Sequence, residues 1–245
     1  QRQMCIRDRP TGVEIAHASE VVEICDNPAN AFREKKDSSL TVGLNLLKSG
    51  AGDAFVSAGS TGALLSAATL LVKRIKGIRR AALAPVVPTG NGGAVLIDCG
   101  ANAECKPSML CQFAVLASAY AKAGFGIENP RVGLLNNGTE EHKGDPLHQQ
   151  TYKLLGKMDV INFAGNIEGR DIMIGDVDVA VCDGFSGNIA LKSIEGCGKL
   201  ILSLLKKEAT SSLSTKIGSL FLMKGFKRMR ARLDFEAVGL SLIHI

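Results

Sequence analysis

The sequence predicts an α/β fold with a mainly parallel sheet. The chain has 245 residues, of which 46% are apolar, enough to bury the core of one large domain or two small ones. Its apolar runs are short and stay far below the eighteen residues that a membrane span needs. In the middle of the chain, a β-prone run is repeatedly followed by a Gly- and Asn-rich loop and then by a helical stretch. This order is typical of parallel sheets.

Four such strand, loop and helix units follow one another. The apolar, β-branched runs predict strands at residues 53–56, 94–97, 131–135 and 178–182. Helical stretches follow at 63–73, 107–124 and 146–155, and a long helix opened by the loop 183–188 ends near Lys207. Two further runs, 12–16 and 160–163, predict additional strands.

The four loops after these strands predict one anion site. They are Ser57–Gly62, Asp98–Asn102, Asn136–Gly144 and Asp183–Asn188. In parallel sheets such loops meet at one crevice, where Gly-rich turns and helix N-termini bring backbone N–H groups to an anion. A single loop of this kind is usually only a turn, but four in succession favour a phosphate-type ligand. None has the spacing of a Walker or dinucleotide motif, so ATP and NAD are not indicated.

Positive charge is concentrated near the C-terminus. Between Lys206 and Arg232 there are eight basic residues and one acid, which leaves 21 bases and 23 acids elsewhere, a net charge of −2. A general nucleic-acid-binding surface is therefore disfavoured.

Residues 206–233 predict a basic amphipathic helix or helical hairpin. Two interpretations stay open: a membrane-binding surface, and a core- or dimer-facing helix with a solvated charged side. Gly218 and Gly225 argue against one rigid rod. The residues expected to face a membrane are Leu213, Ile217, Leu220, Phe221, Lys224, Lys227 and Arg228.

The two ends are expected to be artefact tags from a transposon-based sequencing library. Residues 3–9 can be encoded by CAG ATG TGT ATA AGA GAC AG, whose reverse complement encodes Leu240–Ile245. We therefore expect tags at 1–9 and 240–245, and an incomplete domain at 10–239.

Seven cysteines without zinc or redox spacing, and the lack of a signal peptide at the start, predict reduced thiols in a cytoplasmic protein.

Several ordered motifs resemble one family. They are Ser57-Ala-Gly-Ser-Thr-Gly-Ala63, Asp98-Cys-Gly-Ala-Asn102, Pro130-Arg-Val-Gly-Leu-Leu-Asn136, Phe163-Ala-Gly-Asn-Ile-Glu-Gly169 and Asp183-Gly-Phe-Ser-Gly-Asn188. Together they closely resemble the bacterial PlsX family, the phosphate acyltransferases of phospholipid synthesis, from about Gly12 to Gly239.

The resemblance implies a fold, a reaction and partners. The fold is a three-layer α/β/α sandwich akin to phosphotransacetylases and isocitrate-dehydrogenase-like enzymes. The reaction transfers a fatty acyl group from acyl carrier protein to inorganic phosphate, without a metal or cofactor. The implied enzyme is a cytoplasmic homodimer, peripheral to an anionic membrane, whose product serves a glycerol-phosphate acyltransferase.

Two residues are expected to carry the chemistry. Lys143, beside Gly144 in a loop after a strand, suits a phosphate clamp or a donor to the oxyanion or the leaving sulfur. Asn188 suits either an N-cap or an amide donor to the acyl carbonyl or phosphate. Residues expected to contact phosphate or substrate, or else their own loop backbone, are Ser60, Thr61, Asn102, Asn136 and Asp183. Asp98 is expected to be structural, and His148 to lack an acid partner.

The chain also departs from the family pattern. Ser60 stands where the family often has Asn, and Ala81 where Pro is common. The family's opening Asp-Ala-Met-Gly-Gly-Asp loop and its closing His-Gly-Ser-Ser segment are absent, so the fragment is expected to lack part of its site. Two alternatives remain: a short-chain transferase that uses acyl-coenzyme A, and a non-catalytic membrane scaffold.

Overall fold

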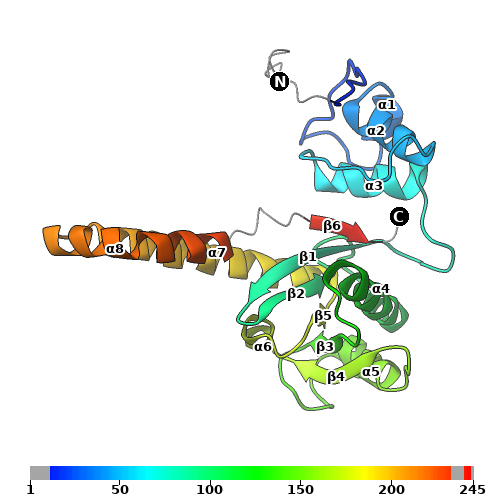
Figure 1. The fold of residues 1–245 in the computed structure, drawn as a ribbon. Coiled ribbons are helices and arrows are strands. Elements are labelled where there is room, and N and C mark those ends of the chain that lie inside the picture. The colour runs from blue at the N-terminus through cyan, green and yellow to red at the C-terminus, as the bar shows by residue number, and fades with distance from the viewer. Residues whose placement is uncertain (1–11, 233–239, 244–245) are drawn as a thin grey trace. The chain divides into compact units, whose positions relative to one another are not determined.

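The structure, a computed structural model, describes residues 12–232 and 240–243 (Figure 1). The chain divides into two compact units, with the boundary between Lys73 and Arg74.

In its described part, residues 12–73, the first unit has three helices: α1 (Ala31–Glu34), α2 (Ser39–Lys48) and α3 (Thr61–Leu71). The hydroxyl of Ser38 caps α2 by accepting from Thr41 N. Leu44 of α2 and Ala67 and Ala68 of α3 are buried, and the small alanines allow close helix packing.

The strands predicted at 12–16 and 53–56 are wrong. Both segments lack regular structure, and no strand lies beside them in the described part of this unit. Val56 is 93% exposed and Ile15 is 70% exposed, so neither run is buried as a central strand would be. Phe55 instead lies directly against Gly43 of α2, where any Cβ would collide with its ring.

The second unit contains a mixed sheet with the strand order β4-β3-β5-β2-β1-β6. The strands are β1 (Ala82–Thr89), β2 (Gly92–Ile97), β3 (Arg131–Leu135), β4 (Asn162–Ile167), β5 (Val179–Val181) and β6 (Leu240–Ile243). β2, β5, β3 and β4 are parallel, whereas β1 pairs antiparallel with β2 and with β6. β6 thus comes from residues expected to be a tag.

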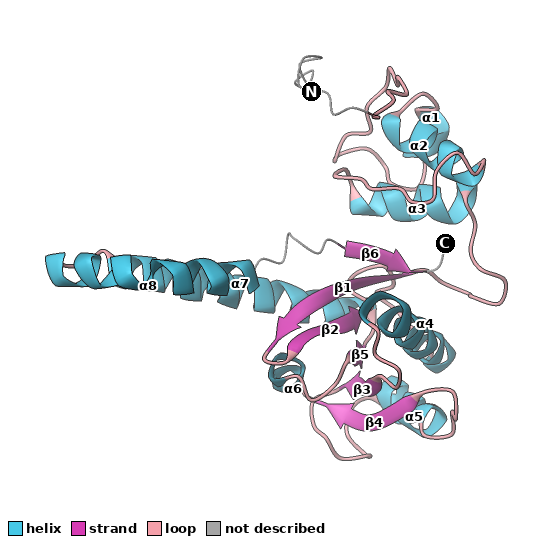
Figure 2. Ribbon diagram, in the orientation of Figure 1, coloured by secondary structure: helices cyan, strands magenta, loops and turns pink. Residues whose placement is uncertain are grey.

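Helices cover both faces of this sheet (Figure 2). Alternate strand residues, such as Val95 and Ile97, pack with Phe113 of α4 (Pro107–Phe125), and α5 (Pro146–Leu155) packs beside α4. The intervening residues, such as Leu96, pack with α6 (Gly169–Ile174) and α7 (Gly184–Ala209) on the other face. The three-layer α/β/α prediction is therefore confirmed, and its core follows the two-residue period of the strands.

Several other elements differ from the sequence prediction in their presence or their bounds. β1 was not predicted, because Pro85 and Pro88 interrupt its apolar run and proline disfavours a central strand. β4 begins at Asn162 rather than Val160, which is 70% exposed. The loop expected at 183–188 is already helical from Gly184 onward.

The basic segment is helical. α8 (Leu213–Arg232) runs back along α7 as an antiparallel hairpin (Figure 1). The expectation that Gly218 and Gly225 would break the rod is wrong, since α8 continues through both. A glycine costs about 1 kcal/mol relative to alanine inside a helix but does not forbid it. Within residues 12–232 and 240–243, no helix has the length and apolar character to cross a bilayer.

Candidate functional site

Three of the four predicted loops lie at one edge of the second unit's sheet. β3, β5 and β2 are adjacent and parallel, so the segments that follow them leave from the same edge. These segments begin at Asn136, Asp183 and Asp98. The fourth loop, Ser57–Gly62, belongs to the first unit and follows no strand, so its place in the same site stays a prediction.

Asp98 organises the loop after β2. Its buried carboxylate accepts from the backbone N–H groups of Leu83 (3.0 Å), Ala101 (3.1 Å) and Asn102 (2.8 Å). Burial raises the pKa of Asp98, an effect that these bonds and the Asn102 side chain oppose. The expected structural role fits this geometry.

The side-chain amide of Asn102 is committed to the protein. Its Nδ2 donates to Ala81 O at 2.7 Å and to Asp98 Oδ2 at 2.9 Å. Both amide protons are therefore used, which leaves Oδ1 as the side-chain group that Asn102 can offer a ligand. A carbonyl oxygen suits a hydrogen-bond donor of a ligand better than it suits a phosphate anion.

Asp183, rather than Asn188, caps α7. Its side-chain Oδ1 accepts from Phe185 N at 3.0 Å and Ser186 N at 2.9 Å. Gly184 N donates to Asn102 O at 2.8 Å, and Gly187 N donates to Asp183 O at 2.9 Å. The N–H groups of the first turn of α7 are all hydrogen-bonded within the protein. They therefore cannot form the backbone anion site that was expected at this helix N-terminus.

Asn188 keeps a free amide in this setting. Its side chain is exposed and, within the described residues, forms no hydrogen bond. A Cβ on Gly100, whose φ is +119°, would lie 3.7 Å from both Cγ and Nδ2 of Asn188. The amide thus lies against the loop after β2 and can donate to a bound group.

Lys143 projects from a tightly bonded loop. Its backbone N–H donates to Glu140 O at 3.1 Å, and its carbonyl accepts from Asn136 Nδ2 at 3.2 Å. The Lys143 ammonium lies 4.0 Å from Glu140 Oε1, and both side chains are substantially exposed, so this ion pair holds it weakly. Asn136, predicted to contact substrate, braces the Lys143 loop in this structure.

A histidine–carboxylate pair adjoins this loop and was not predicted. His148 Nδ1 lies 2.6 Å from Asp145 Oδ1, which also caps α5 by accepting from His148 N. Burial raises the pKa of Asp145, but the bonds and charge of His148 outweigh it and lower that pKa. The expectation that His148 lacks an acid partner is wrong; its three-residue spacing from Asp145 was the available signal.

A charged cavity of about 390 Å³ adjoins Asn102. Arg80 and Lys106 line it together with Glu104, Cys105 and Met109. Burial raises the pKa of Cys105 to about 11, so its thiol is protonated at neutral pH and is a poor nucleophile. The two basic side chains favour an anionic occupant.

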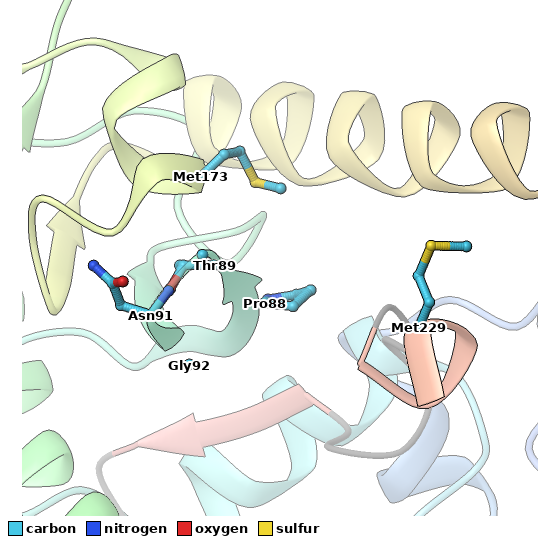
Figure 3. Close-up of a pocket in the computed structure, with 7 residues that line it drawn as sticks. Pro88, Thr89, Asn91, Gly92, Met173 and Met229 are labelled. Carbon is cyan, nitrogen blue, oxygen red and sulfur yellow. The ribbon is translucent and has the colours of Figure 1, made fainter. Parts of the chain in front are cut away.

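A second cavity, of about 690 Å³, lies at the opposite edge of the sheet, beside the β1–β2 turn. Figure 3 shows Met173 of α6 and Met229 of α8 beside Pro88 and Thr89, the last residues of β1. The side chains that line this cavity carry no charge.

Two predicted contacts belong to the first unit. The hydroxyl of Ser60 caps α3 by accepting from Ala63 N at 3.4 Å, and Thr61 is the exposed first residue of that helix. Both residues thus belong to the N-terminus of α3, and their contact with a substrate stays a prediction.

The predicted membrane-facing side of α8 is largely exposed. Leu213 is 79% exposed, Ile217 is 60% and Phe221 is 85%. Lys224, Lys227 and Arg228 are also exposed, whereas the side chain of Leu220 lies outside the described residues.

Comparison with known proteins decides the family. The model of a family described as "Fatty acid synthesis protein" matches residues 4–244. A "Phosphate acyltransferase" of Thermoanaerobacterium thermosaccharolyticum is 47% identical over 228 residues, which are 93% of this chain and 68% of that protein. The chain belongs to the PlsX family of phosphate acyltransferases. A second PlsX relative, from Thermoanaerobacter pseudethanolicus, is 50% identical over 227 residues and equally covered.

Solved structures support the fold of this PlsX chain. The phosphotransacetylase EutD of Staphylococcus aureus superposes with a TM-score of 0.54 at 23% identity, over 69% of this chain and 58% of that one. A phosphotransacetylase of Streptococcus pyogenes gives 0.55 at 21% identity, with the same coverage. At this identity the likeness establishes the fold alone. Family membership assigns the chain to the acyltransferases of fatty acid and lipid synthesis.

Proposed function

We propose that this chain transfers a fatty acyl group from acyl carrier protein to inorganic phosphate, and that the acyl phosphate supplies a glycerol-phosphate acyltransferase of phospholipid synthesis. The observation that carries the proposal is the placement of Lys143, Asn102 and Asn188 after three adjacent parallel strands. The family membership supplies the reaction class.

The reaction needs few protein groups. A phosphate oxygen attacks the thioester carbonyl carbon, and a C–O bond forms as negative charge develops on the carbonyl oxygen. The intermediate collapses by breaking the C–S bond, and the departing thiolate takes up the proton that phosphate gives up. Phosphate is itself the nucleophile, so the enzyme must mainly position the reactants and stabilise charge.

The site groups divide between these two tasks. The ammonium of Lys143 attracts the phosphate and balances the charge that develops on the oxyanion or the leaving sulfur. The free amide of Asn188 donates to the carbonyl oxygen, where a preorganised donor is worth a factor of about 10²–10³ in rate. Arg80 and Lys106 of the adjoining cavity favour the anionic substrate. Ser60 and Thr61 remain proposed phosphate contacts, and Asp183 acts through the cap of α7.

A substrate comparison tests the proposal. Release of free thiol is measured with long-chain acyl carrier protein and with acetyl-coenzyme A, each with and without phosphate. The complete gene product is used, because this chain spans about two thirds of the length of its relatives. Phosphate-dependent release from the long-chain carrier thioester is expected. Preference for acetyl-coenzyme A would favour the short-chain alternative, and no release with either would favour the scaffold.

We also propose that the enzyme is a homodimer that binds an anionic membrane surface peripherally through the α7–α8 hairpin. The exposed apolar residues of α8 lie among Lys224, Lys227 and Arg228, a combination typical of interfacial helices. Leu202, Leu205 and Phe226 help to line a cavity of about 750 Å³ between the two helices, and Lys199, Lys206 and Lys227 also border it. Each basic residue near an anionic leaflet contributes on the order of 1 kcal/mol to binding.

A further inference from the structure

The carbonyl oxygen of Glu140 accepts two hydrogen bonds. One comes from Lys143 N at 3.1 Å, and the other from Asn166 Nδ2 at 2.8 Å. Asn166 lies on β4 and is only 5% exposed. The turn that presents Lys143 is therefore tied to the neighbouring strand by one buried amide.

A second asparagine holds the other side of Lys143. Asn136, at the end of β3, donates its amide to the Lys143 carbonyl at 3.2 Å. β3 and β4 are parallel neighbours, and Asn136 N continues their ladder by donating to Ile167 O at 2.8 Å. The backbone of Lys143 is thus fixed directly by Asn136 and, through Glu140, by Asn166.

Packing does not explain an asparagine at position 166. Its Nδ2 must face the Glu140 carbonyl, since a carbonyl can only accept. Its Oδ1 is then buried with no hydrogen-bond donor among the described residues. An unpaired buried acceptor costs about 1–3 kcal/mol, which offsets the contribution of about 1 kcal/mol that the bond to Glu140 makes to stability. The bond from Asn166 to the Lys143 turn is therefore the remaining explanation for an amide at this position.

We propose that Asn166 is a positioning residue for Lys143. The inference rests on the proposed catalytic role of Lys143. By holding the Glu140 carbonyl, Asn166 fixes the turn from which the Lys143 side chain departs, and so limits where the ammonium can reach. A displacement of about 1 Å at a reacting group can cost a factor of 10² in rate.

The test compares two alanine substitutions on β4 in the complete gene product. Asn166→Ala removes the bond to the Lys143 turn. Asn162→Ala is the matched control, because Asn162 donates to Asn129 O at 3.4 Å near the start of the same strand. We expect Asn166→Ala to lower kcat at least tenfold with the KM for acyl carrier protein unchanged, and Asn162→Ala to leave both unchanged.

Two further variants separate positioning from stability. Asn166→Val removes the unpaired oxygen and introduces a residue that favours strands. It should unfold at the same temperature as the unaltered enzyme or higher, yet turn over as slowly as Asn166→Ala. In the Lys143→Ala background, Asn166→Ala should cause no additional loss of kcat, because residues that act as a unit are not additive.

Each contrary result has its own meaning. Normal kcat in Asn166→Ala, with Lys143→Ala inactive, overturns the positioning role and leaves the proposed function standing. An equal loss with and without Lys143 shows an independent effect and also overturns it. Normal turnover of Lys143→Ala overturns the assignment of Lys143 and this inference with it.

Discussion

The side chain of Asn188, in the first turns of α7, lies against Gly100 in the loop after β2. A Cβ on Gly100 would be 3.7 Å from Asn188 Nδ2, and the φ of +119° at Gly100 is one that glycine adopts readily and other residues rarely do. The two segments that follow β5 and β2 therefore meet at this contact, and the position of the proposed oxyanion donor depends on a glycine.

Gly100→Ala should lower kcat at least about tenfold, because the altered loop moves against Asn188. Gly92→Ala is the control. Gly92 has a comparable φ of +132°, with nothing within 4 Å of its added Cβ, at the opposite edge of the sheet. It shares the backbone strain but should keep normal turnover; equal losses in both variants would contradict a specific role of the Gly100–Asn188 contact.

Gly187→Ala should destabilise the second unit. Its Cβ would collide with the Asp98 carbonyl oxygen and lie 2.5 Å from Cys182 Sγ, so α7 would have to shift from the sheet. The expected loss in free energy of unfolding is on the order of 2 kcal/mol. Gly196→Ala, farther along α7 with open space around it, should instead stabilise the helix slightly. Urea denaturation measures both, and equal stabilities would refute the close packing.

The stability of the second unit should fall in acid through the Arg131–Asp178 pair. Arg131 donates to Asp178 from its backbone N–H at 2.8 Å and from Nε at 3.1 Å. Burial raises the pKa of Asp178, but the bonds and charge of Arg131 outweigh it and hold that pKa below its ordinary value of 3.8.

A lowered folded-state pKa stabilises the protein above the ordinary value, and this stabilisation is lost as the pH falls through the folded value. Asp178→Asn should therefore be less stable near neutral pH, by about 1 kcal/mol, and should lose less stability on acidification. Asp159→Asn, at an exposed site, is the control. Parallel pH profiles for Asp178→Asn and the unaltered protein would argue against this assignment.

The membrane proposal predicts a charge-dependent association. Replacing Lys224, Lys227 and Arg228 with Gln should sharply reduce co-sedimentation with anionic vesicles at low salt, because it removes positive charges that the vesicle surface attracts. Added salt weakens the same attraction by screening it. The control replaces Lys122, Lys153 and Lys157 of the same unit. Undiminished sedimentation of the α8 variant would count against the hairpin as the contact surface.

The regular elements with strong apolar periodicity were predictable from the sequence. Arg131–Leu135 and Pro146–Leu155 match their predicted bounds, because a buried strand and a proline-started, aspartate-capped helix carry local signals. Phe55 and Val56 carried the local signal of a strand, but the structure places no strand there, and the Phe55 ring lies against Gly43 of α2. β1 was not predicted because its two prolines disfavour a central strand, although it pairs with β2 and β6 in the structure.

The candidate site was predictable in its residue types rather than in their contacts. The order of the strands brings the Lys143, Asp98 and Asp183 segments to one edge, as the strand–loop–helix pattern indicated. The sequence left open whether Asp183 or Asn188 would cap α7, and whether Asn136 would contact a substrate or its own loop; the structure gives the cap to Asp183 and a bond within the loop to Asn136. These bonds join residues close in sequence, so the sequence names the possible partners but does not decide which bond forms.

The most direct test of the central claim is the rate of phosphate-dependent thiol release from long-chain acyl carrier protein by Lys143→Ala in the complete gene product. Lys153→Ala on α5 serves as a charge-matched control. The account predicts at least a 100-fold lower kcat for Lys143→Ala, with an unchanged unfolding temperature and a normal control. A folded Lys143→Ala enzyme with turnover close to that of the unaltered protein would contradict it.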